Sequence, residues 1–213
     1  MRGFRREDET YVAELDEVER EVVARLATDV AELLGATPAQ LAAAQEHVDD
    51  PWAAGEPSVE DRLAGLVDGT AAEPLDPALR RLLPTASEDA EVAAEFRRLT
   101  QVDLRAVKIG RLLALARALR QAGDGRLVVP RERADLLSAA LVDVRLVLAE
   151  RLGVEDDSAA EELYAEIERA EDDPPATTSQ AVRLHLVTAY AALTWLQESL
   201  VTLRLAELDG PEA

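Results

Sequence analysis

Residues 87–123 read SEDAEVAAEFRRLTQVDLRAVKIGRLLALARALRQAG and predict one long helix. Ser87 stands at its start as a helix cap, and Gly123 stands at its end. Acidic residues fill the first turns, whereas Arg117 and Arg120 lie in the last turns, an arrangement that complements the helix dipole. We expect the rest of the chain to pack around this helix.

The charge of this part of the chain is opposite in sign to that of the rest. Between Arg80 and Arg133 there are twelve Lys and Arg against seven Asp and Glu, a net charge of +5, whereas the whole chain of 213 residues carries −20. So acidic a protein repels a phosphate backbone unless its basic centre is exposed. We therefore expect nucleic acid to be a poor partner.

The composition predicts a mainly α-helical fold. Apolar residues make up 48% of the chain but aromatic residues only 3%, so the core is built from Leu, Val and Ala, which suit close helix packing. We predict a single domain over residues 1–213, a helical bundle with two long central helices. The absence of cysteine excludes disulfides, thiolate metal sites and a cysteine nucleophile.

Caps, prolines and glycines divide the chain into elements. Residues 3–15 lack helical spacing and predict a β-hairpin, which we expect the β-branched residues 126–129 to join as a third strand, because an isolated hairpin is marginal. The last helix is apolar on most sides, which predicts a place in the middle of the bundle. The predicted helices cover residues 17–34, 37–47, 59–67, 77–83, 87–123, 131–152, 158–170 and 177–208. Residues 48–86 are repeatedly interrupted by proline and glycine, and we expect a mobile or partner-ordered segment there.

One side of the 87–123 helix is basic. The five cations that share an arc of about 140° at ~100° per residue are Arg97, Arg98, Arg105, Lys108 and Arg111. The apolar residues of the opposite side are Phe96, Leu99, Val102, Ala106 and Val107. This pattern has two interpretations: a face that binds an anion, a nucleic acid or another partner, or a face whose cations pair with acidic residues of the same chain.

A second pattern suggests charge pairs between two helices. The spacing Val-Asp-x-Arg-x-Val-x-x-x-Arg-Leu occurs at residues 102–112 and again at 142–152. If the two helices pack antiparallel, Asp103 can pair with Arg145 and Asp143 with Arg105. We predict that these pairs fix the register of the helices; coincidence in a chain rich in Leu, Val and Arg is the alternative.

The sequence contains few candidate catalytic residues. His47 and His185 are the two histidines, neither has a carboxylate at metal-ligand spacing, and His185 lies among apolar residues that suggest a core or boundary position. Phosphate-binding loops, dinucleotide fingerprints and nucleophile elbows are absent from the sequence. We predict no catalytic residue, no cofactor and no metal. With neither a secretory signal nor an apolar run of ~20 residues, we expect a cytoplasmic protein without a membrane partner.

Several motifs in a fixed order carry a family resemblance. They are DPALRRLLP at residues 76–84, AEFRRLT at 94–100 followed by Asp103-Leu-Arg105 and Lys108, VRL at 144–146 with Ala149-x-Arg151-Leu-Gly153, and WLQESLV at 195–201. The chain resembles the uncharacterised bacterial family called domain of unknown function two-thousand-seventeen. Val142 departs from the pattern, which has Asn before Asp143.

The resemblance implies little about activity. Genes of this family often lie beside the gene of ClpS, an adaptor of the Clp protease, and some members carry the label of transcriptional regulator. Together with the residues, this predicts a non-enzymatic cytoplasmic protein-interaction or regulatory module, with a Clp component as a candidate partner. The alternatives are a nucleic-acid-binding regulator that uses the basic side of the 87–123 helix and, third, an enzyme.

Overall fold

The structure is a computed structural model that describes residues 1–53, 73–172 and 174–208. Its helices and a small sheet occur in the order that the sequence predicts, and the mainly α-helical fold with a small β element is confirmed. The helix predicted at residues 59–67 lies outside the described residues. In the described part of the chain, no helix is long and apolar enough to cross a membrane.

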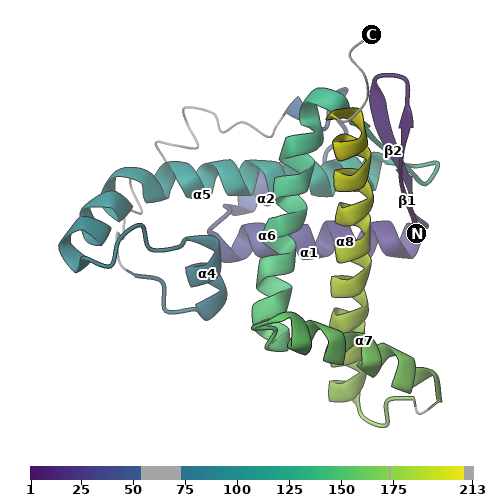
Figure 1. Cartoon of the computed structure of the whole chain (residues 1–213). Helices are drawn as coiled ribbons and strands as arrows, with labels where there is room; N and C mark the ends of the chain where they lie inside the picture. Colours follow the sequence, from purple (N-terminus) through teal and green to yellow (C-terminus); the bar gives the residue numbers. More distant parts are fainter. Residues whose placement is uncertain (54–72, 173, 209–213) are drawn as a thin grey trace.

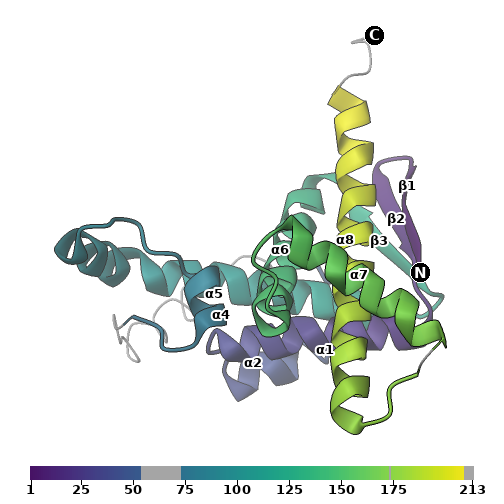
Figure 2. The ribbon, with the colours of Figure 1, turned by 60° about the horizontal axis from the view of Figure 1, so that its bottom comes forward.

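Two pairs of helices cross each other to form the body of the molecule. Helix α1 (Glu17–Leu33) runs beside α5 (Ala90–Gln121), and α6 (Ala134–Leu152) runs beside α8 (Thr178–Leu208). Both views show the second pair lying across the first (Figures 1 and 2). The core between them consists mainly of Leu, Val and Ala, as the composition predicts.

The predicted three-stranded sheet is present. Strands β1 (Arg2–Glu7) and β2 (Thr10–Glu14) form the hairpin, and β3 (Arg126–Pro130) pairs antiparallel with β2, with Val12 opposite Val128. Strand β2 is therefore central, and β1 and β3 are the two edges.

Each edge of the sheet meets a side chain from another part of the fold. On β1, the backbone N–H of Phe4 donates to Ser199 Oγ of α8 at 2.9 Å. On β3, the indole Nε1 of the buried Trp52 donates to the carbonyl oxygen of Val128 at 3.1 Å. These contacts occupy backbone groups that an open edge would offer to another strand.

We expect Trp52→Phe to lower the free energy of unfolding by about 1–2 kcal/mol, because it removes the donor to Val128 and leaves a small cavity. Thermal and urea unfolding will measure the change. Trp195→Phe is the matched control: the Trp195 ring is nearly half exposed, so its replacement is expected to cost about 0.5 kcal/mol or less. Equal losses in the two variants would show that the indole hydrogen bond contributes nothing.

Short elements complete the fold. They are α2 (Pro38–Ala43), α4 (Pro77–Leu82), the 3₁₀ turn η2 (Arg131–Arg133) and α7 (Asp157–Asp172). The predicted capping boxes of α1 and α2 are confirmed: Asp16 and Glu19 form the first, and Thr37 and Gln40 form the second. The predicted cap of α5 is wrong by two residues, since the Asp89 carboxylate accepts from the first free N–H groups and Ser87 accepts from Asp89.

Helix α8 does not lie in the middle of the bundle. One side packs on α6, α7 and β1, whereas Val182, Trp195 and Leu205 are about half exposed on other sides. The apolar composition of α8 therefore does not reflect full burial; its apolar residues outnumber the positions that the neighbouring elements cover.

Helix α5 has two parts with different surroundings. Its carboxyl-terminal part, residues 112–119, is buried in the body, where even Arg117 is 7% exposed. Its amino-terminal part projects beyond the end of α1 in both views (Figures 1 and 2). We call residues 90–104 the α5 arm.

Candidate functional site

The basic side of α5 contains a buried charge cluster. Asp143 of α6 has no exposed surface, and it accepts from Lys108 Nζ at 2.6 Å and from Arg111 Nε at 2.6 Å. Lys108 is itself 9% exposed, and Arg111 is mostly buried. Two cations around one carboxylate leave a net positive charge inside the crossing of α5 and α6.

Two other arginines of α5 bind the carboxyl-terminal ends of neighbouring helices. Arg105 donates to the carbonyl oxygen of Leu34 at the end of α1 at 2.9 Å, and Arg117 donates to that of Ala43 at the end of α2 at 3.0 Å. Neither α1 nor α2 has a basic residue in its last turn. Helix α5 thus supplies the positive charge that a helix carboxyl terminus favours. Burial lowers the pKa of the Arg105 guanidinium, which still carries its charge at neutral pH.

The structure corrects the predicted charge pairs. Arg105 contacts Leu34, whereas Arg145 donates to Gln197 of α8 at 2.8 Å and lies over the ring of Tyr190. Asp103 is exposed on the arm and has no ion pair among the described residues. The pairs Asp103–Arg145 and Asp143–Arg105 therefore do not form. Helices α5 and α6 cross instead of running antiparallel, so they meet at one region, where Asp143 reaches Lys108 and Arg111.

The remaining two cations of the predicted basic face lie on the arm. Arg98 is exposed and forms a two-pronged hydrogen bond with Glu95, one turn earlier, and Arg97 is partly buried. Four of the five cations therefore donate to acceptors of the same chain within its described part. This supports the interpretation of internal pairing, although among these five cations only Lys108 and Arg111 form ion pairs with an acidic residue of another described helix.

The opposite side of the arm presents apolar side chains to solvent. Phe96 is 49% exposed and Leu99 is 60% exposed; Val92 and Leu104 are exposed as well, and so is Val107, just beyond the arm. Val92, Phe96 and Leu99 fall within an arc of about 60° on the helix. We call this group the apolar stripe. The apolar side of the arm thus faces solvent, whereas farther along α5 the basic side faces the body through Arg105, Lys108 and Arg111.

Acidic residues accompany the apolar stripe. The exposed charged residues of positions 88–103 are Glu88, Asp89, Glu91, Glu95, Arg98 and Asp103. Five acids against one base give the exposed surface of this segment a net charge of −4. The arm and the two acidic residues that precede it thus combine exposed apolar side chains with an acidic surface.

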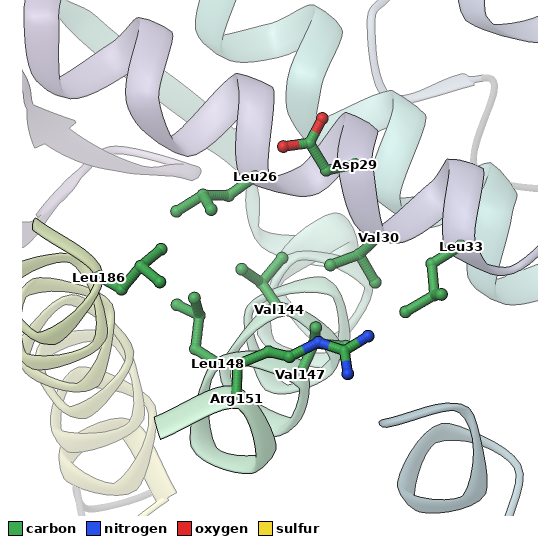
Figure 3. Close-up of a pocket in the computed structure, with 9 residues that line it drawn as sticks. All are labelled: Leu26, Asp29, Val30, Leu33, Val144, Val147, Leu148, Arg151 and Leu186. Atoms are coloured by element: carbon green, nitrogen blue, oxygen red, sulfur yellow. The ribbon is translucent and has the colours of Figure 1, made fainter. Parts of the chain in front are cut away.

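A groove lies between α1, α6 and α8 and has a volume of about 260 Å³. Aliphatic side chains from the three helices line it, among them Leu26, Val144 and Leu186 (Figure 3). The Asp29 carboxylate at its rim points away from these aliphatic groups, and Arg151 pairs with Asp76 at 2.5 Å. Burial raises the pKa of Asp29, against the opposing charge of Arg25. Converging polar groups, which mark most small-molecule sites, do not line this groove among the described residues.

The histidines lie elsewhere. His185 is exposed on α8, so its predicted core or boundary position is wrong; no element in the described part of the chain covers it. His47 is also exposed. Within residues 1–53, 73–172 and 174–208, no three His, Asp or Glu side chains gather as ligands for a metal ion.

A second polar cluster joins the sheet to the end of α8. Glu207 Oε2 accepts from the hydroxyl of Tyr11 at 2.6 Å and from Arg131 at 2.8 Å. The hydrogen bond from Tyr11, with the charges of Arg131 and Arg6, holds the pKa of Glu207 below its usual value. Burial, together with the Glu207 carboxylate, raises the pKa of Tyr11 above 10.0. No spacing in the sequence indicates this cluster, because Tyr11 and Glu207 are 196 residues apart.

The lowered pKa of Glu207 predicts an acid-sensitive contribution to stability. The contribution is present above the pKa of the unfolded glutamate, about 4.3, and is lost as the pH falls through the lower folded value. We expect Glu207→Gln to lower the melting temperature at pH 7 and to change it less below pH 4. Thermal unfolding from pH 3 to 8 will measure this, with Glu198→Gln on the same helix as the control. A difference from the parent protein that is independent of pH would contradict the prediction.

A model of the family described as "Domain of unknown function (DUF2017)" matches residues 1–203. The chain belongs to this family. No curated protein and no solved structure matches the chain. The family assignment confirms the resemblance carried by the sequence motifs. In this DUF2017 chain the motif residues Lys108 and Arg151 both lie in ion pairs that join elements of the fold.

Proposed function

We propose that this DUF2017 chain is a non-enzymatic protein-interaction module and that the apolar stripe of the α5 arm is its partner-binding surface. The observation that carries the proposal is the exposure of Val92, Phe96 and Leu99 on one side of a helix that projects from the body. Neighbouring exposed apolar side chains on a projecting element are typical of protein interfaces, whereas scattered ones are ordinary.

Two further features favour this function over the alternatives. The cations of α5 donate mostly to acceptors within the chain, which leaves few of them for a phosphate backbone. The apolar groove and the exposed histidines provide no arrangement of acid, base and nucleophile among the described residues. A low-salt mobility-shift assay tests the nucleic-acid alternative, for which we expect no binding.

Site-specific photo-crosslinking in cells of the native host tests the proposal. A photoreactive amino acid replaces Phe96 in one variant and Leu99 in a second; the same replacement at Val182, an equally exposed position on α8, is the control. We expect both arm variants to yield the same discrete adduct with another protein, which mass spectrometry identifies, and the control to lack it. The adduct of the Phe96 variant should disappear when Leu99 is also replaced by Asp, and the adduct of the Leu99 variant should disappear when Phe96 is also replaced by Asp.

The same adducts from the arm and from Val182, or adducts only between copies of this chain, would overturn the proposal. The gene neighbourhood implied by the family resemblance makes a Clp component the first purified protein to test. Binding to such a component should be lost in Leu99→Asp and retained in Val182→Asp.

A further inference from the structure

The spacing of the arm residues indicates the shape of what binds them. Val92, Phe96, Leu99 and Asp103 follow one another at intervals of four, three and four residues and all are exposed. This is the alternation of core positions by which one helix packs against another in a coiled coil.

The charges around the apolar stripe indicate the sign of the partner. The exposed surface of residues 88–103 carries five acids and one base, and Arg98, the base, is already paired with Glu95. A second copy of the arm would bring acids against acids, in a chain whose total charge is −20. Like charges along a helix interface oppose pairing, whereas opposite charges favour it.

Asp103 adds a requirement at one position. We call Val92, Phe96, Leu99 and Asp103 the seam. Asp103 occupies one of its core positions, where a packed helix would remove the carboxylate from water. A carboxylate in such a place is costly unless a cation pairs with it, and none does among the described residues of this chain. A Lys or Arg of the partner opposite Asp103 would satisfy it and would fix the register of the two helices.

We infer that the partner of the α5 arm is a basic amphipathic helix, with Lys or Arg along the borders of its apolar side and one cation facing Asp103. This inference rests on the proposed function of the arm and specifies the chemistry of its partner. The seam spans three turns, so it suits a weak and reversible complex.

Two synthetic peptides of about 20 residues test the inference with the full chain. The first peptide has Leu at the core positions of each heptad, except that Lys replaces one of these Leu residues, and its other positions are Lys, Gln and Ala. The second peptide has the same composition, but its order of residues forms no apolar side. Fluorescence anisotropy measures both affinities. We expect the first peptide to bind at least about tenfold more tightly than the second, and to lose about tenfold in affinity with Phe96→Asp.

The Phe96→Asp variant separates seam packing from general attraction between opposite charges. It makes the chain more acidic, so attraction without packing would tighten binding, whereas loss of the seam weakens it. Asp103→Asn should weaken binding of the peptide with the core Lys and should strengthen binding of a peptide that has Leu in place of that Lys. Val182→Asp, with the same added charge on α8, should leave the preference for the first peptide unchanged. Circular dichroism verifies that each variant is folded.

Equal affinities for the two peptides, or tighter binding by Phe96→Asp, would overturn the inference. A concentration-dependent dimer that Phe96→Asp dissociates would assign the seam to a second copy and would overturn it as well. The crosslinking experiment separates this failure from that of the proposed function: a discrete adduct at residues 96 and 99 keeps the arm as the binding surface, while the peptides decide the chemistry of the partner.

Discussion

Asp143→Asn is expected to destabilise the protein by about 3–5 kcal/mol, because it leaves Lys108 and Arg111 in the crossing of α5 and α6 without a counter-charge. Domains of this kind are stable by about 5–15 kcal/mol in total, so the loss is a large part of the whole. The amide keeps the shape of the carboxylate, which makes the lost charge the cause. Urea unfolding at pH 7 measures the change.

Asp103→Asn is the matched control for this experiment. It removes an acid from the same helix that carries Lys108, but Asp103 is exposed, so the expected change is within about 0.5 kcal/mol. The double variant should equal the sum of the two, because the residues share no partner. A loss from Asp103→Asn as large as that from Asp143→Asn would instead support the paired arrangement predicted from the sequence.

Replacement of the whole cluster is a different experiment with a different result. Lys108→Met, Arg111→Met and Asp143→Leu together remove all three charges, and buried ion clusters replaced by apolar groups often lose no stability. We expect the triple variant to be more stable than Asp143→Asn alone. Such a result would show that the cost of Asp143→Asn comes from the buried cations that it leaves unpaired.

Leu115→Ala is expected to cost about 2–5 kcal/mol, since Leu115 is fully buried in the body and its removal leaves a cavity between packed helices. Leu99→Ala, on the same helix, is expected to change the free energy of unfolding by about 0.5 kcal/mol or less, because Leu99 is 60% exposed. Chemical unfolding measures both variants.

The contrast between these two leucines also tests the role of the arm. Leu99→Ala should weaken partner binding without weakening the fold, whereas Leu115→Ala should weaken the fold. If Leu99→Ala destabilised the protein as much as Leu115→Ala, the apolar stripe would belong to the folded core, and its proposed role in binding would fail.

Most of the elements could be predicted because their signals are local. The capping box at Asp16, the proline after Thr37 and the glycine at Gly153 mark helix ends through the nearest backbone groups alone. The third strand at residues 126–130 could be predicted as well, since a β-branched segment and an incomplete hairpin need each other.

The arrangement of the helices could not be predicted in the same way. Repeated Asp-x-Arg spacing suggested an antiparallel pair, but crossing angles depend on packing along both helices, which a short motif does not encode. The cluster at Asp143 was therefore predicted with the right acid and the wrong cations. The helix carbonyls of Leu34 and Ala43 were missed as acceptors, because every helix end offers them and the sequence does not show which arginine will reach them.

Exposure was the other property that periodicity left open. Phe96 and Leu115 lie on the same predicted helix, and both are apolar at helical spacing, yet one is half exposed and the other is fully buried. The difference arises from where each residue lies along α5: residues 112–119 are enclosed by the body, whereas the arm projects beyond it (Figure 1), and no described element covers its apolar side. A sequence pattern reports one side of a helix, whereas burial requires a second element to cover it.

The contacts between the ends of the chain also constrain the order of folding during synthesis. Phe4 and Ser199 are 195 residues apart in the sequence, and Tyr11 and Glu207 are 196 residues apart. The free edge of β1 is therefore covered only after α8 has left the ribosome. Until then the hairpin exposes unpaired backbone groups of the kind through which nascent chains associate with one another. Production of this protein should therefore depend on how quickly translation proceeds from β3 to α8, and chains that stop before α8 should aggregate.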